Sequence, residues 1–79
     1  MRNFLNKIEV NPKILGNKPI IRGTRISVEF ILELLDSKMT PQEIAQEYPQ
    51  LTLTDVYAAI SYATGIVKQE EILIPKFTD

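Results

Sequence analysis

The chain has 79 residues, 44% of them hydrophobic, and a formal charge of −1, which suits one small domain with a modest core. It contains neither cysteine nor histidine, which excludes disulfides, thiol nucleophiles, histidine bases and the usual zinc sites, so we expect no enzyme, no metal and no cofactor. No apolar run reaches the ~20 residues of a membrane span, and the first residues lack the apolar core of a signal peptide, so we expect a cytoplasmic protein without a membrane partner.

The first part of the chain, residues 1–26, is predicted to form a β-strand and hairpin arm. Residues 5–10 alternate apolar and polar side chains, which is typical of a half-buried strand. Residues 19–22 and 25–27 are expected to be two short strands around a turn at Gly23, because glycine reaches positive φ without steric cost. Residues 1–25 hold six basic side chains against one acidic, a net +5, while residues 26–79 have a net −6. This split favours an edge that faces a polyanion, unless it is chance in a short chain.

A first helix is predicted to begin after Ser27, a good N-cap residue. Apolar side chains then fall at i, i+3, i+4 and i+7, at Val28, Ile31, Leu32 and Leu35. Acidic side chains occupy the outer face of this helix, at Glu29, Glu33 and Asp36.

Two further helices are predicted from capping boxes. Thr40 and Glu43 can cap a short helix reciprocally, and this helix must end before Pro49, which lacks an N–H. Thr52 and Asp55 can open a third helix in the same manner, and we expect that helix to end near Gly65.

The predicted fold is mainly α: a three-helix, homeodomain-like helix-turn-helix with a short N-terminal β-hairpin. We expect a single domain over residues 1–79, in which residues 1–26 are the arm, residues 27–67 the three-helix core and residues 68–79 an extended tail. The apolar residues 72–74 of the tail could form a short strand, and residues 70–77 could add a strand to a partner by edge pairing.

The turn around Gly23 provides the first group of candidate binding residues. Its cationic and polar side chains, which could grip a phosphate or a carboxylate, are Lys18, Arg22, Thr24 and Arg25. In the alternative, the arginines form ion pairs with Glu29 or Glu33 on the following helix, and their only role is to hold the hairpin against that helix. The two readings are balanced for Arg22, whereas pairing is favoured for Arg25, which lies closer in sequence to these acids.

The start of the third helix provides a second, weaker group. Thr52, Thr54 and Tyr57 could contact a DNA backbone, which positions a protein on DNA without reading sequence. The first two turns of this helix lack the arginine, asparagine and glutamine that usually read bases, and Asp55 there would repel phosphate. A packing or dimer surface is therefore at least as good an interpretation of this helix.

Two segments resemble the bacterial domain-of-unknown-function family 433. They read KPIIRGTRISV at residues 18–28 and TPQEIAQEYPQLTLTDVYAAISYA at residues 40–63, and the resemblance covers roughly residues 8–64. The chain departs from the family pattern at Asn17 and Lys38, where the family commonly has glycine.

The resemblance implies a homeodomain-like fold and the role of antitoxin in a type II toxin–antitoxin pair. It implies a PIN-like, magnesium-dependent ribonuclease as the partner toxin, and operator DNA bound by a homodimer. Two hypotheses remain open: a DNA-binding antitoxin whose arginines contact phosphate, and a pure protein-interaction or dimerisation module without DNA binding, in which Arg22 or Arg25 engages a carboxylate-rich site of the nuclease.

Overall fold

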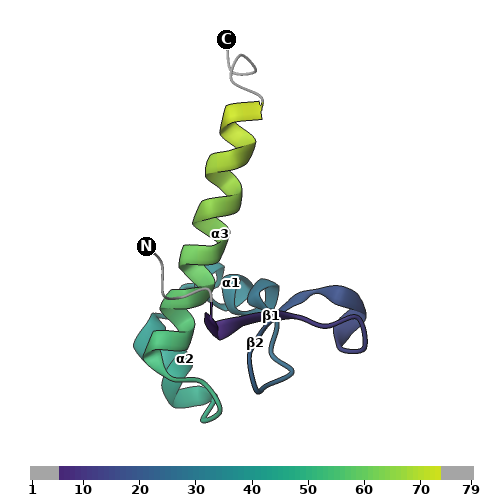
Figure 1. Cartoon of the computed structure of the whole chain (residues 1–79). Helices are drawn as coiled ribbons and strands as arrows, with labels where there is room; N and C mark the ends of the chain where they lie inside the picture. Colours follow the sequence, from purple (N-terminus) through teal and green to yellow (C-terminus); the bar gives the residue numbers. More distant parts are fainter. Residues whose placement is uncertain (1–5, 74–79) are drawn as a thin grey trace.

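The computed structural model describes residues 6–73, of which residues 69–73 are described by their backbone alone. Three helices form most of the fold (Figure 1): α1 (Val28–Asp36), α2 (Pro41–Glu47) and α3 (Leu53–Leu73). Two short strands precede them, β1 (Ile8–Val10) and β2 (Pro19–Ile21). This arrangement confirms the predicted fold class, a mainly α protein of three helices with a short N-terminal hairpin.

The strands of this hairpin differ from those predicted. Strand β1 pairs antiparallel with β2, in the register Ile8 to Ile21, Glu9 to Ile20 and Val10 to Pro19. The predicted pairing of residues 19–22 with 25–27 is wrong, because it is reduced to one isolated bridge between Ile20 and Ser27. The reason is that Ser27 already caps α1, so the chain must leave the sheet there.

A left-handed turn connects the two strands. Leu15, Gly16 and Asn17 have φ angles of 52°, 60° and 78°, so three successive residues lie in a region that L-residues avoid. Lys38, between α1 and α2, also has a positive φ of 82°. Asn17 and Lys38, the two positions where glycine is commonly found in the family, are thus both left-handed in this chain.

The predicted helix starts are confirmed in atomic detail. The Ser27 side chain accepts a hydrogen bond from the Phe30 N–H at 2.9 Å. At the start of α2, Thr40 and Glu43 form the expected reciprocal capping box, with distances of 2.8 and 3.1 Å.

Helix α3 is longer than predicted. It continues through Gly65 to Leu73, so an extended segment beginning at residue 68 and a strand at residues 72 and 73 are both wrong. A glycine inside a helix costs only about 1 kcal/mol relative to alanine, and no proline follows until Pro75. The rest of the predicted tail, residues 74–79, lies outside the described residues.

The core lies where α1, α2 and the N-terminal half of α3 meet the hairpin. Its largest fully buried side chains are Ile20, Ile21, Ile31, Ile44 and Val56. Figure 1 shows that the C-terminal half of α3 projects from this body. Over residues 6–73, no helix combines the length and apolar character needed to cross a membrane.

Candidate interaction site at the Arg25 turn

The turn that carries Arg25 is built by its own polar groups. The Thr24 N–H and hydroxyl both donate to the Ile21 carbonyl, at 3.0 and 2.8 Å, and the hydroxyl oxygen accepts from the Ile26 N–H at 3.0 Å. Gly23 has a φ of 84°, which glycine adopts without strain. Thr24, predicted as a binding residue, therefore uses its hydroxyl to hold the turn.

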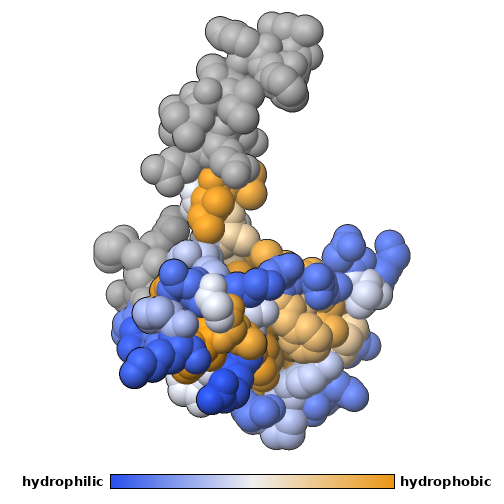
Figure 2. Space-filling model, turned by 90° about the vertical axis from the view of Figure 1, so that its right-hand side faces the viewer, coloured by the Kyte–Doolittle hydropathy of each residue, from blue (hydrophilic) through white to orange (hydrophobic). Residues whose placement is uncertain are grey.

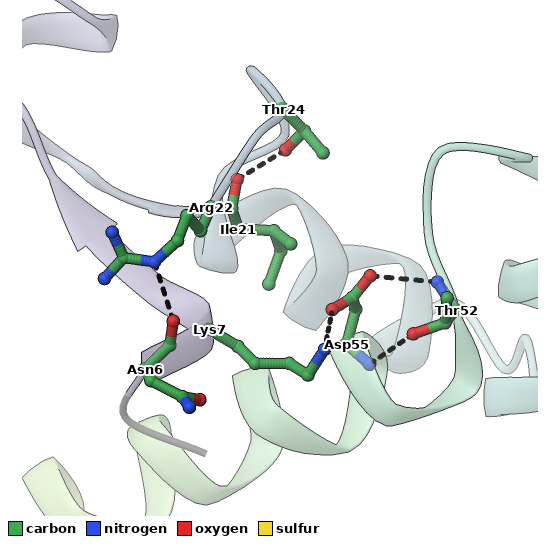
Figure 3. Close-up of polar contacts among 7 residues, drawn as sticks. All are labelled: Asn6, Lys7, Ile21, Arg22, Thr24, Thr52 and Asp55. Atoms are coloured by element: carbon green, nitrogen blue, oxygen red, sulfur yellow. Dashed lines mark hydrogen bonds and ion pairs between the residues drawn. The ribbon is translucent and has the colours of Figure 1, made fainter. Parts of the chain in front are cut away.

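Arg22 is turned back onto residues 6–8, which lead into strand β1. Its backbone N–H donates to the Lys7 carbonyl at 2.8 Å, and its Nε donates to the Asn6 carbonyl at 2.7 Å (Figure 3). A longer contact of 3.5 Å joins a terminal guanidinium nitrogen to the Ile8 carbonyl. One arginine thus bonds to three consecutive carbonyls at residues 6–8, where the chain enters β1. Neither acid predicted as its partner, Glu29 or Glu33, is bound to it.

Glu29 pairs with Lys18 instead. The Lys18 Nζ lies 2.8 Å from the Glu29 Oε1, with both side chains more than half exposed. The hydrogen bond from Glu29, followed by its charge, raises the pKa of the Lys18 ammonium above its ordinary value. Lys18 therefore joins the hairpin to the start of α1 through an ion pair, and a phosphate would have to compete with Glu29 for its ammonium group.

Asp55 has a different role from the one expected. It is buried, with only 8% of the residue exposed, and accepts the Thr52 N–H at 3.0 Å while Thr52 Oγ1 accepts the Asp55 N–H at 3.1 Å. Lys7 lies 3.5 Å from the other carboxylate oxygen (Figure 3). The expectation that Asp55 repels phosphate is therefore wrong, because the carboxylate faces inward and has a cation beside it.

Arg25 is the predicted cation that keeps a free guanidinium. It is exposed, and within residues 6–68 it makes no hydrogen bond or ion pair, so the favoured pairing with Glu29 or Glu33 is not found. It lines an open hollow together with Gly23, Thr24 and Gln50, over the buried Ile20. Glu9 and Ile14 complete the lining.

Gln50 was not among the binding residues predicted from the sequence. Its place in the sequence could have indicated an exposed side chain. Gln50 follows Pro49 in the short turn between α2 and α3, and turn residues usually lie on the surface. The hollow therefore joins the Arg25 turn to the α2–α3 turn, two segments 25 residues apart in the chain.

The remaining predicted residues lie outside the hollow. Thr52 uses its hydroxyl in the helix cap, whereas Thr54 and Tyr57 are exposed on the first turns of α3, with Tyr57 43% exposed. Among the described residues no cluster of acidic side chains is suited to hold a metal ion.

These observations define a small three-helix domain in which the turn between β2 and α1 presents the exposed Arg25 beside the turn between α2 and α3. The chain belongs to the family described as "Protein of unknown function (DUF433)", whose match covers residues 8–63. It is also similar to a solved structure, a DUF433 member protein from Anabaena variabilis ATCC 29413. The two chains are 30% identical, with a TM-score of 0.74, and the similarity covers 89% of this chain and 69% of the other. A search of curated proteins found no match.

Proposed function

We propose that this protein is the antitoxin of a type II toxin–antitoxin pair. In this proposal it neutralises a PIN-like ribonuclease and, as a homodimer, binds operator DNA through the face formed by the Arg25 turn and the α2–α3 turn. The family resemblance motivates the role. The structural observation that carries it is the free Arg25 guanidinium, which lies in one hollow with Gln50 at the N-terminal end of α3.

DNA binding by this face would rest on few contacts per copy. Arg25 can neutralise one phosphate, while Gln50 and Thr54 can donate hydrogen bonds to phosphate oxygens. Each neutralised phosphate steepens the dependence of log K on log salt concentration by about 0.9, so one arginine gives a shallow slope and a weak monomer complex. A second copy on the same duplex would double the number of phosphate contacts and therefore the salt slope, and would strengthen the complex.

A pure protein-interaction module is the second candidate, and two observations favour it. Lys18 and Arg22 are both engaged within the protein, which reduces the cationic surface available to DNA. The first two turns of α3 also lack base-reading side chains. In this alternative Arg25 enters the carboxylate-rich site of the nuclease, where a guanidinium would compete with the metal ion.

The variant Arg25→Ala separates the two candidates, with Lys38→Asn as a matched control. Both remove one positive charge from an exposed side chain, and asparagine tolerates the positive φ of residue 38. If DNA binding is correct, Arg25→Ala weakens the mobility shift of the upstream DNA and reduces its salt slope by about 0.9 per copy, while Lys38→Asn leaves both unchanged.

Inhibition of the PIN-like nuclease that this proposal expects the neighbouring gene to encode is measured with the same variants. A loss confined to inhibition supports the protein-interaction module, and a loss confined to the DNA shift supports the operator-binding antitoxin. If the wild-type protein neither shifts DNA at low salt nor inhibits the nuclease, the proposed function is rejected.

A further inference from the structure

The two-stranded sheet has one face toward the core and a second face away from it. Ile8 and Ile21 lie opposite each other in the register, and both belong to the core cluster. Glu9 and Ile20 form the next pair, and because side chains alternate along a strand, both point to the second face. The hollow with Arg25 lies over this second face, since Glu9 and Ile20 line it.

Two opposite charges line this hollow without binding each other. Glu9 is half-buried, and within residues 6–68 its carboxylate makes no hydrogen bond or ion pair; the same is true of the exposed Arg25 guanidinium. The hollow has a volume of about 540 Å³, and small-ligand sites typically measure roughly 300–1,000 Å³. The space between the carboxylate and the guanidinium can therefore hold a third group.

The lining of the hollow combines these polar groups with apolar side chains. Ile14 and Ile20 contribute the apolar part, while Arg25, Glu9 and the Gln50 amide contribute the polar part. Figure 2 views the molecule from the side to which the β1–β2 turn projects, and it shows apolar surface bordered by hydrophilic residues there. A ligand that matches this lining has an apolar face and polar edges.

The two charges require a ligand that accepts and donates hydrogen bonds at the same time. A guanidinium only donates, and a carboxylate only accepts. A phosphate or a carboxylate would satisfy Arg25 but would place a like charge in the hollow beside Glu9. A peptide offers one N–H and one C=O per residue, whereas the guanidinium and the carboxylate can each form two parallel hydrogen bonds.

We propose that the hollow binds an unpaired guanine base. Guanine presents the acceptors O6 and N7 on one edge, which is the pair that arginine binds most commonly among the bases. On the adjacent edge its N1–H and N2 amino group are two parallel donors, which match the Glu9 carboxylate. Adenine and cytosine have one amino group and uracil has one N–H, so none of them can give a carboxylate two parallel bonds.

The guanine must be unpaired for two reasons. In a duplex, its N1–H and N2 amino group are already bonded to cytosine, and a base that remains stacked cannot enter a hollow. An unpaired base has both faces free, so Ile14 and Ile20 can contact the ring while Glu9 and Arg25 bind its edges.

This inference goes beyond the proposed function, because neither operator binding nor nuclease inhibition requires guanine. The Arg25 side chain is common to both, so a guanine in the hollow and an operator phosphate would compete for it. The measurements below use neither operator duplex nor nuclease. The proposed function can therefore fail while guanine still binds, and guanine binding can fail while DNA binding or inhibition is still observed.

Calorimetric titration of the full chain with nucleoside monophosphates tests the ligand. We expect GMP to bind roughly tenfold more tightly than AMP, CMP or UMP. Inosine monophosphate lacks the N2 amino group that faces Glu9, and 7-deaza-GMP lacks the N7 that faces Arg25, so each should bind roughly tenfold more weakly than GMP. Equal binding of the four nucleotides, or no binding of GMP, would overturn the inference.

Two substitutions assign the two edges of the base. Glu9→Gln should weaken GMP binding roughly tenfold and reduce the preference for GMP over inosine monophosphate. Arg25→Lys keeps the charge but not the forked donors, so it should reduce the preference for GMP over 7-deaza-GMP. Glu47→Gln is the matched control, since Glu47 is an exposed residue at the end of α2 outside the hollow, and it should bind GMP as the wild type does.

The sign of the Glu9→Gln effect distinguishes a base site from a phosphate site. If the hollow took only the phosphate of a nucleotide, removal of a negative charge would strengthen the binding of all four nucleotides alike. That result would contradict the inference, which expects weaker binding confined to GMP.

Short strands distinguish the two sources of an unpaired guanine. A uridine heptamer with one central guanosine and its DNA counterpart are compared with GMP and with the same strands carrying a central adenine. Tighter binding of a guanine-centred strand than of GMP assigns the site to single strands, equal affinity assigns it to a free guanine nucleotide, and either result supports the inference. Equal affinity for guanine-centred and adenine-centred strands would oppose it.

Discussion

The two capping boxes of this protein have nearly the same geometry but differ in burial, which leads to a quantitative prediction. The Glu43 carboxylate accepts the Thr40 N–H at 2.8 Å in an exposed setting, and the Asp55 carboxylate accepts the Thr52 N–H at 3.0 Å in a partly buried one. Water can replace Glu43 after truncation, so Glu43→Ala should lower the free energy of unfolding by about 0.5–1 kcal/mol.

Asp55→Ala should cost about 2–3 kcal/mol. It leaves the partly buried Thr52 N–H without its acceptor, which costs about 1–3 kcal/mol. It also removes the ion pair with Lys7, worth less than about 1 kcal/mol because the Lys7 side chain is 40% exposed. For a domain of this size, the melting temperature should fall by roughly 4–8 °C per kcal/mol.

Urea denaturation followed by circular dichroism measures both costs on the same scale. Lys7→Met separates the contribution of the ion pair, since it leaves the carboxylate and its hydrogen bond in place. If Asp55→Ala costs no more than Glu43→Ala, burial does not determine the strength of these caps, and the reasoning is refuted.

Four further substitutions test other parts of the structure by the same denaturation assay. Lys38→Gly should stabilise the protein by about 1 kcal/mol, because residue 38 has a φ of 82°; a loss of stability would show that the turn is not left-handed. Gly65→Ala should also stabilise it, by up to about 1 kcal/mol, since no heavy atom outside the local chain lies within 4 Å of an added Cβ and α3 passes through this position. A neutral or destabilising result would indicate that the helix ends there. Arg22→Ala should cost about 1–3 kcal/mol through its lost carbonyl contacts, whereas Arg25→Ala should cost less than about 0.5 kcal/mol; equal costs would contradict the different environments of the two arginines.

The helix starts could be predicted from sequence because capping is local. Ser27, Thr40 and Thr52 each bond to a backbone N–H three residues further on, so donor and acceptor lie in one short window of sequence. The end of α3 could not be predicted in this way. Gly65 is compatible with a helix end and with a helix interior, and the choice depends on surroundings that the local sequence does not specify.

The strand pairing was missed for a related reason. It depends on the left-handed turn at Leu15–Asn17, and leucine in this conformation follows no residue preference. The hairpin around Gly23 was the simpler expectation, because the glycine signal there is strong, but its second arm is used by the cap of α1.

The roles of the two arginines could not be separated from sequence either. Arg22 binds main-chain carbonyls, and these are present at every residue, so no side-chain identity indicates them as partners. Sequence proximity to Glu29 and Glu33 favoured an ion pair with Arg25. The Glu29 carboxylate instead binds Lys18, eleven residues before it in the chain. Arg25 is available to a partner because it makes no hydrogen bond or ion pair within residues 6–68, and it lines a hollow with Gln50.

The rigid construction of the Arg25 turn has a consequence for the thermodynamics of binding. The Thr24 bonds and the Ile21 N–H to Ile26 carbonyl bond order the backbone before any partner arrives. A ligand therefore immobilises one long side chain, at a cost of about 0.5–1.5 kcal/mol, instead of ordering a whole loop at about 1–2 kcal/mol for each residue. Removing the Thr24 hydroxyl should accordingly weaken binding through a less favourable entropy, even though that hydroxyl does not have to touch the ligand.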